Sequence, residues 1–82
     1  MEYKIYTGTI IMINQGFMKA TFRLMYCGMP NGNTFVLSPQ ITKGYAGFSS
    51  NIYYNINSKF IQVTNLQFDV IEVTPEYIII GN

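Results

Sequence analysis

The sequence predicts a single all-β domain over residues 1–82, with little or no helix. It is built either as a small antiparallel barrel of five or six strands, SH3-like or OB-like, or as a two-layer sandwich. The composition is the first reason, since 49% of the residues are apolar and 16% aromatic, enough for one modest core and incompatible with disorder. Short alternating stretches rich in Ile, Tyr and Thr are the second. Turn signals made of Gly, Pro and Asn separate these stretches.

Two strands are expected before the first proline, over residues 2–13 and 17–27. The second of them alternates between apolar and polar side chains, as a half-buried strand does. A loop with an even number of residues puts the apolar residues of both strands on one face. We therefore expect a hairpin closed by the two-residue turn 15–16, in which Ile11 faces Ala20.

The outer face of this hairpin is unusually apolar for a surface in contact with water. It is predicted to carry Tyr6, Ile10, Met12 and Met25. A second sheet, the closure of a barrel or a partner molecule would cover such a face. These four residues are therefore the predicted oligomer interface.

The middle of the chain is predicted to be less regular. Residues 28–33 combine Pro with an Asn-Gly pair and predict a reversal of the chain. A short strand is expected over 34–37, and it should end at Pro39, which cannot donate to a central ladder. Residues 40–47 have no sustained period and are expected to be irregular, with at most one helical turn over 39–43.

The C-terminal part returns to a β pattern. Residues 48–56 alternate, so that one face is apolar and the other carries amides and a phenol. Over 60–73 the apolar phase shifts twice, which predicts bulges or a break near Asn65 and near Val70. A last strand is expected over 77–80, after a proline turn.

Charge and composition exclude several functions. Five Lys and Arg against four Asp and Glu give a net charge of +1, so nucleic-acid binding would need a local basic patch. The chain has one cysteine, Cys27, and no histidine, so neither an intrachain disulfide, a Cys/His zinc site nor a cofactor is expected. We expect Cys27 to be a partly buried apolar residue, because no imidazole can activate its thiol.

Catalysis is not expected. General acid–base chemistry would depend on Asp69 and Glu72, and a separation of three places two strand residues on opposite faces unless the expected bulge realigns them. The sequence contains no GxGxxG, P-loop, HExxH or GxSxG pattern. The protein is therefore predicted not to be an enzyme.

Residues 43–48 form the first candidate binding site. Flanking glycines let a backbone approach a ligand closely, a lysine offers a cation and two rings offer stacking surfaces. The residues concerned are Lys43, Gly44, Tyr45, Gly47 and Phe48. The alternative is that the glycines only permit a tight connection and that the tyrosine covers the core.

Two strand faces are further candidates. The polar face with Asn51, Tyr53 and Asn55 could bind a partner through amide and phenol hydrogen bonds. The basic pair Lys19 and Arg23, four residues apart on the outer face of the first hairpin, fits a surface for single-stranded nucleic acid. Ordinary solvated strand faces explain both patterns as well.

The leading functional hypothesis is a non-catalytic interaction or assembly module that forms homo-oligomers, of the kind found among small viral or phage β proteins. Charges are scarce, and few Lys or Glu residues protect the strand edges. One alternative is a barrel that binds single-stranded nucleic acid or a nucleotide through its Lys, Arg and Tyr side chains; another is an inhibitor of a different protein. The sequence shows no signal peptide and no membrane span, so an intracellular or virion location is expected.

Overall fold

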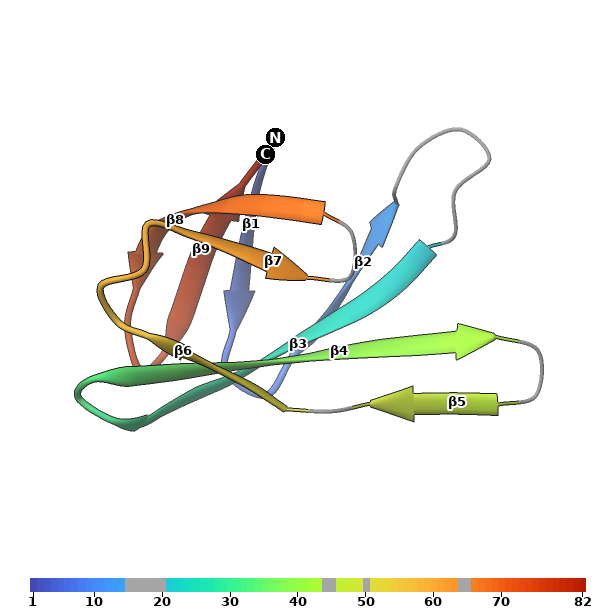
Figure 1. Ribbon diagram of the computed structural model, residues 1–82, viewed down its shortest axis with the longest axis horizontal. Helices are drawn as coiled ribbons and strands as arrows, with labels where there is room; N and C mark the ends of the chain where they lie inside the picture. Colours follow the sequence, from blue (N-terminus) through green and yellow to red (C-terminus); the bar gives the residue numbers. More distant parts are fainter. Residues whose placement is uncertain (15–20, 44–45, 50, 64–65) are drawn as a thin grey trace.

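The computed structural model describes the backbone of residues 1–14, 21–43, 46–49, 51–63 and 66–82 (Figure 1). In this part of the chain every regular element is a β-strand, which confirms the predicted all-β class. The described strands are β1 (Glu2–Tyr6), β2 (Ile10–Asn14), β3 (Thr21–Asn31), β4 (Thr34–Lys43), β5 (Ala46–Ser49), β6 (Ile52–Asn55), β7 (Phe60–Val63), β8 (Leu66–Val73) and β9 (Tyr77–Gly81). The described strands are more numerous than the five or six expected, because three of the predicted strands are each divided into two.

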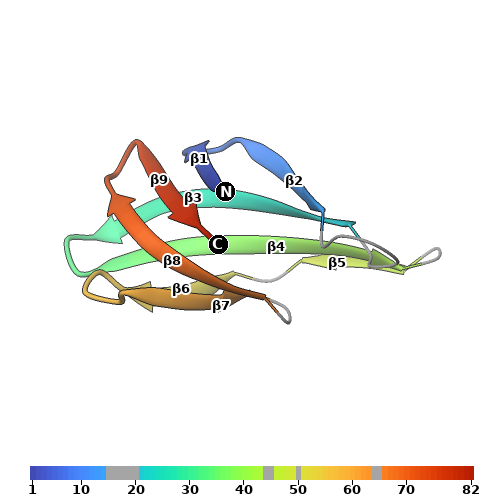
Figure 2. The same ribbon diagram turned by 90° about the horizontal axis from the view of Figure 1, so that it is seen from above.

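The strands form two antiparallel sheets. The terminal sheet has the order β1-β9-β8-β7, and the central sheet has the order β2-β3-β4-β5, with β6 also pairing with β4. In the described residues these sheets do not close into a barrel, so the sandwich is the architecture observed. Figure 2 shows β3 and β4 running through the middle of the molecule, with β1 and β2 on one side and β6 and β7 on the other. No described residue belongs to a helix long and apolar enough to span a bilayer.

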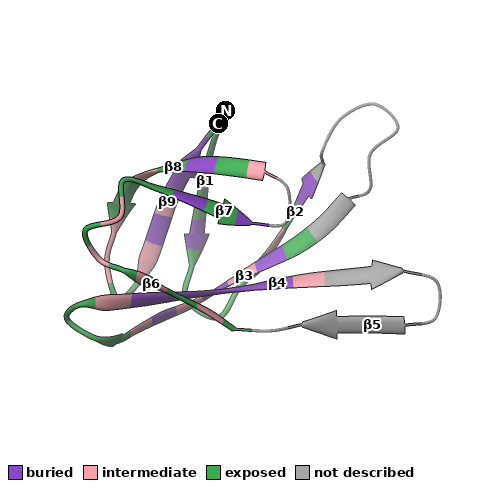
Figure 3. Cartoon of the chain, in the orientation of Figure 1, coloured by how far each residue is buried: buried purple, intermediate pink, exposed green. Residues whose placement is uncertain are grey.

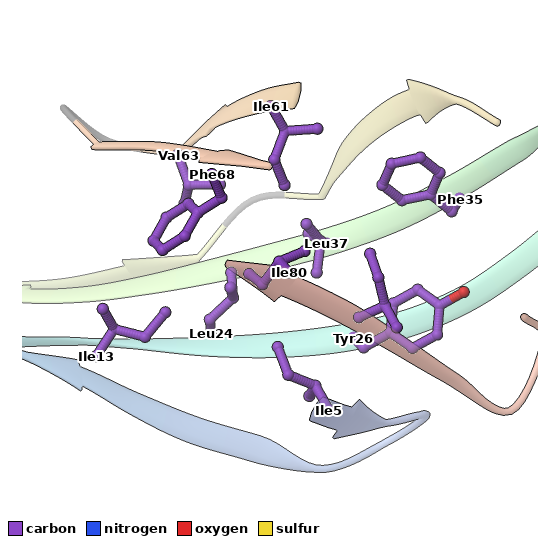
Figure 4. Packing of buried hydrophobic residues seen from close by; sticks show 11 residues of the cluster. Ile5, Ile13, Leu24, Tyr26, Phe35, Leu37, Ile61, Val63, Phe68 and Ile80 are labelled. Atoms are coloured by element: carbon purple, nitrogen blue, oxygen red, sulfur yellow. The ribbon is translucent and has the colours of Figure 1, made fainter. Parts of the chain in front are cut away.

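The core lies between the two sheets and is built from both. Buried and exposed residues alternate along β7, as Figure 3 shows, because successive side chains point to opposite faces. In β4, by contrast, all residues from Phe35 to Pro39 are buried. Figure 4 shows side chains from the two sheets converging on the space between them. The largest fully buried residues are Tyr26, Phe35, Phe68, Ile5, Ile13, Leu24, Leu37, Ile78, Ile80 and Val63.

The predicted strand 2–13 is in fact two strands that belong to different sheets. The chain turns at Gly8, whose φ of +84° suits a residue without a side chain. Thr9 fixes the corner, since both its backbone N–H and its hydroxyl donate to the Tyr6 carbonyl, at 2.9 and 2.6 Å. As a result Ile5 pairs with Ile78 of β9, and only β2 remains to pair with β3.

The two-residue turn expected at 15–16 lies outside the described residues, but the register predicted with it is wrong. Ile11 faces Leu24 rather than Ala20. The register differs from the predicted one by four residues, an even number, so the same side chains still face the core. An alternating pattern cannot distinguish such registers, and the observed one opposes larger apolar side chains.

The hairpin of β3 and β4 turns where the Asn-Gly signal predicts a reversal. Strand β3 continues to Asn31, and Thr34 is its partner across the turn. The side-chain oxygen of Asn31 accepts a hydrogen bond from the Asn33 N–H at 2.8 Å, a local turn typical of Asn. The earlier part of the predicted turn is strand because register shifts on either side of Gly28 accommodate it.

Strand β4 continues through Pro39, although the sequence predicts that it ends there. The ladder of β4 with β6 ends at Leu37, and its ladder with β5 begins at Gln40. Pro39 lies between these two ladders, where no described residue pairs with β4 on the side of β5 and β6. The missing N–H of Pro39 therefore costs the sheet little. The helical turn and the irregular segment expected from Pro39 onward are not observed, because β4 and β5 occupy the described residues there.

The two phase shifts predicted over 60–73 are confirmed. The predicted strand is divided into β7 and β8, which end and begin on either side of residues 64–65. The pairing of β8 with β9 shifts between Val70 and Glu72, which leaves Ile71 as the extra residue of a bulge.

Hydrogen bonds around Tyr26 and Thr7 tie the two sheets together. The Tyr26 hydroxyl of β3 donates to the Thr74 carbonyl at 2.6 Å, and the Thr7 hydroxyl donates to the Pro75 carbonyl at 2.6 Å. The Gly8 N–H donates to the Tyr26 carbonyl at 2.8 Å. The turn before β9 and the corner between β1 and β2 are thereby both fixed to the central sheet.

Candidate interaction surfaces

The outer face of β2 and β3 presents apolar side chains to solvent. Ile10 pairs with Met25 and Met12 pairs with Arg23, so these four residues point away from the core together. Ile10 is 45% exposed and Met12 is 64% exposed. We call these residues the central face; Arg23 is its charged member among the side chains that the structure describes.

Three of the four residues of the predicted interface lie on this face, and the fourth does not. Ile10, Met12 and Met25 are on the central face, whereas Tyr6 belongs to β1 and pairs with Tyr77 in the terminal sheet. The cause is the corner at Gly8, which sends the two halves of the predicted strand into different sheets.

The outer face of the terminal sheet is acidic and partly apolar. Glu2 and Asp69 are both partners of Gly81, and Asp69 also pairs with Phe60, so they form one row across the sheet. The side chain of Ile71 reaches over Gly81, with Cδ1 3.2 Å from where a glycine Cβ would be. We call this row, together with Glu72, the terminal face; Phe60 is 58% exposed and Ile71 is 50% exposed.

The bulge in β8 brings the two carboxylates of this strand to the same side. Asp69 pairs with Gly81 and Glu72 pairs with Ile79. Their partners are two residues apart and therefore share a face. The bulge therefore realigns Asp69 and Glu72, as the sequence requires for the two to act together. The described residues contain no group of three acidic, Cys or His side chains suited to a metal ion.

A network of aromatic and charged groups covers the end of the terminal sheet. The Lys4 ammonium lies 4.3 Å from the centroid of the Tyr77 ring and 5.2 Å from that of Tyr6. The Tyr77 hydroxyl donates to Glu72 at 2.9 Å, and this hydrogen bond raises the pKa of Tyr77. A side-chain hydrogen bond with Tyr6 is the main cause of the raised pKa of Lys4. Sequence patterns do not predict this network; the i, i+2 spacing of Lys4 and Tyr6, which places both on one face of a strand, is the available signal.

The first candidate binding site, residues 43–48, is described only in part. Lys43 ends β4, and Gly47 and Phe48 lie in β5, where they pair with β4. Gly44 and Tyr45 lie outside the described residues, and so do the side chains of Lys43 and Phe48. The proposed ligand loop therefore stays a sequence prediction.

The polar face of β6 has the predicted alternation. Asn51, Tyr53 and Asn55 are exposed, and Tyr54 between them stacks on Phe35 at a ring-centroid distance of 5.3 Å. Asn55 has a local role, since its side-chain oxygen accepts the Asn57 N–H at 2.8 Å. Tyr53, 64% exposed, is the large side chain that this face offers to a partner.

The remaining predicted residues are divided between the described and undescribed parts of the chain. Arg23 is exposed on the central face. Lys19 lies outside the described residues. Cys27 is half-buried as expected, and burial raises the pKa of its thiol, which disfavours the reactive thiolate.

Fold and surfaces together define the class of this protein: an antiparallel β-sandwich in which each sheet exposes a partly apolar outer face. Comparison of the chain with protein-family models, curated proteins and solved structures finds no significant match. The function is therefore inferred from the residues of the chain itself.

Proposed function

We propose that the protein is a non-catalytic interaction module that self-associates, and that the central face is one of the surfaces through which copies bind each other. The observation that carries this proposal is the exposure of Ile10 and Met12, at 45% and 64%, beside the half-buried Met25. Clustered apolar side chains on an outer sheet face mark an interaction site more often than a solvated surface. Burying them against a second copy adds hydrophobic stabilisation that a domain of this size otherwise lacks.

The edge of the central sheet supports the same proposal. Strand β2 is an edge strand and contains no charged residue. The edge strand β1 of the terminal sheet, by contrast, carries exposed Glu2 and Lys4, the kind of charged side chain that prevents pairing between molecules. Little therefore opposes the approach of a second copy at β2.

Light scattering after gel filtration tests this proposal. The wild-type particle should have a mass above the 9.4 kDa of one chain, and Met12→Lys or Ile10→Lys should shift it toward one chain by placing a charge in the apolar contact. Asn57→Lys, which adds the same charge at an exposed residue of the β6–β7 connection, is the matched control and should leave the mass unchanged. A wild-type mass of one chain from micromolar to millimolar concentration would contradict the proposal.

A second candidate, binding of single-stranded nucleic acid or a nucleotide, is favoured by the distribution of charge. Residues 10–55 contain Lys19, Arg23 and Lys43 and no acidic residue. Fluorescence anisotropy of a labelled oligonucleotide at low salt tests it, since saturable binding should weaken with added salt and in Arg23→Ala and Tyr53→Ala variants. No change in anisotropy at low salt would eliminate this candidate.

A further inference from the structure

The two sheets carry opposite net charge. The strands and connections of the terminal sheet contain four acids against Lys4 and Lys59, a net of −2, whereas the described strands of the central sheet contain Arg23 and Lys43 and no acid, a net of +2. With Lys19, which lies outside the described residues, these two values give the +1 of the whole chain. The mild segregation of charge along the sequence therefore becomes a separation between two sheets.

Each sheet also exposes apolar side chains beside its charges. On the central face, Ile10 and Met12 adjoin Arg23. On the terminal face, Phe60 pairs with Asp69, and Ile71 reaches over the neighbouring Gly81. The strands β2 and β7, at the edges of these two faces, lie on opposite sides of the β3–β4 pair (Figure 2). One copy can therefore offer both faces to two different neighbours.

We propose that copies of this chain associate head to tail, with the central face of one copy against the terminal face of the next. This inference rests on the proposed self-association and specifies its geometry. The contact places Arg23 of one copy opposite the carboxylates around Asp69 of the next, and it buries apolar side chains from both.

A symmetric contact would be electrostatically worse. Two central faces would bring their Arg23 side chains together. Lys4 pairs with Ile79, as Glu72 does, and so lies on the terminal side with Glu2, Asp69 and Glu72; two terminal faces would therefore oppose a net charge of −2 to a net charge of −2. Like-charge juxtaposition of this kind opposes association. A head-to-tail contact joins two different surfaces, so one contact leaves a free surface at each end, and the assembly grows into a ring or a filament.

Charge-reversal variants test the geometry. Arg23→Glu and Asp69→Lys should each weaken self-association by about tenfold or more, because each faces like charge in the next copy. Asp69 is chosen because Glu72 accepts the Tyr77 hydroxyl, which should not be disturbed. The double variant Arg23→Glu/Asp69→Lys restores opposite charges and should return the dissociation constant to within about threefold of the wild type. Glu76→Lys, in the turn before β9, makes the same charge change as Asp69→Lys off the terminal face and should have little effect.

Failure of this geometry is distinguishable from failure of the proposed function. An assembly that stops at two copies would show a symmetric contact, and an Asp69→Lys variant that associates like the wild type would show that the terminal face takes no part. Either result would overturn the head-to-tail arrangement while leaving self-association in place. A wild-type protein that stays monomeric would overturn both. Far-ultraviolet circular dichroism of each variant shows whether it is folded, and the salt dependence of wild-type association provides a reading that needs no variant.

Discussion

At Gly28 the central sheet packs closely against Thr7, which follows β1, and Pro75, which precedes β9. Its φ is +87°, a region that other residues adopt at a cost. A Cβ there would lie 3.2 Å from the Thr7 side chain and 3.7 Å from the Pro75 carbonyl oxygen. Gly8 has nearly the same φ, +84°, but nothing lies within 4 Å of its Cβ position. A comparison of substitutions at Gly8 and Gly28 therefore separates the energetic cost of backbone conformation from the cost of close packing.

Gly8→Ala should reduce the free energy of unfolding by about 1 to 2 kcal/mol, the cost of a left-handed residue with a side chain. Gly28→Ala should reduce the free energy of unfolding by at least about 1 kcal/mol more than Gly8→Ala does, because the Thr7 side chain must also move. Urea denaturation of the two variants measures both values. Equal destabilisation would mean that the contact of Gly28 with Thr7 is not tight.

For single residues, the sequence predicts which face of a strand a side chain occupies but not which side chains of other strands lie next to it. The alternation from Asn51 to Asn57 is observed as expected, because the period of a strand is a local property. The cluster of Lys4, Tyr77 and Glu72 is not foreseeable in the same way, since it depends on which strands pair.

Two tyrosine hydroxyls connect elements of different sheets. Tyr26 of β3 donates to the Thr74 carbonyl between β8 and β9, and Tyr54 of β6 donates to the Gln62 carbonyl of β7 at 3.0 Å. Both rings pack in or against the core, whereas the ring of Tyr53 is 64% exposed. These hydrogen bonds should contribute to holding the sheets together.

Tyr26→Phe and Tyr54→Phe should each lower the free energy of unfolding by about 1 kcal/mol, and leaving the partner carbonyl unsatisfied could raise this cost to about 2 kcal/mol. Tyr53→Phe is the matched control and should change it by less than about 0.5 kcal/mol. Chemical denaturation of the three variants measures the differences. A cost for Tyr53→Phe as large as that for the other two would contradict the assigned roles.

The same tyrosines predict a loss of stability at alkaline pH. Burial raises the pKa of Tyr26 and of Tyr54, so the folded protein holds these protons more tightly than the unfolded chain. Their contribution is fully present below about pH 10, the ordinary value for tyrosine, and is lost as the pH rises through the higher folded-state pKa values. Unfolding measured from about pH 8 to about pH 11 should show this decrease, smaller in Tyr26→Phe and Tyr54→Phe. An identical pH dependence in all variants would contradict it.

Element boundaries are predictable where the cause is local. The bulge in β8 follows from a shift of apolar phase, and the turn at Asn31-Gly32 follows from residue type. The continuation of β4 through Pro39 is not predictable from the sequence, because it depends on where the ladders with β6 and β5 end and begin. The length of the β2–β3 loop is likewise ambiguous, since registers that differ by an even number bury the same side chains.

For the whole molecule, the all-β class follows from composition and alternation, but the choice between barrel and sandwich does not. That choice depends on the corner at Gly8, which sends β1 into the terminal sheet and β2 into the central sheet. The segregation of charge is visible in the sequence, and the structure converts it into a difference between two faces. Self-association is proposed from the central face alone, and the head-to-tail geometry is proposed from the central and terminal faces together.

Sedimentation equilibrium of the wild-type protein at increasing concentration and salt tests the central claim most directly. We expect an average mass that rises beyond two chains with concentration and falls as salt screens the attraction between the two faces. A mass that stays at one chain at every concentration, or that levels off at two chains whatever the salt, would contradict head-to-tail self-association.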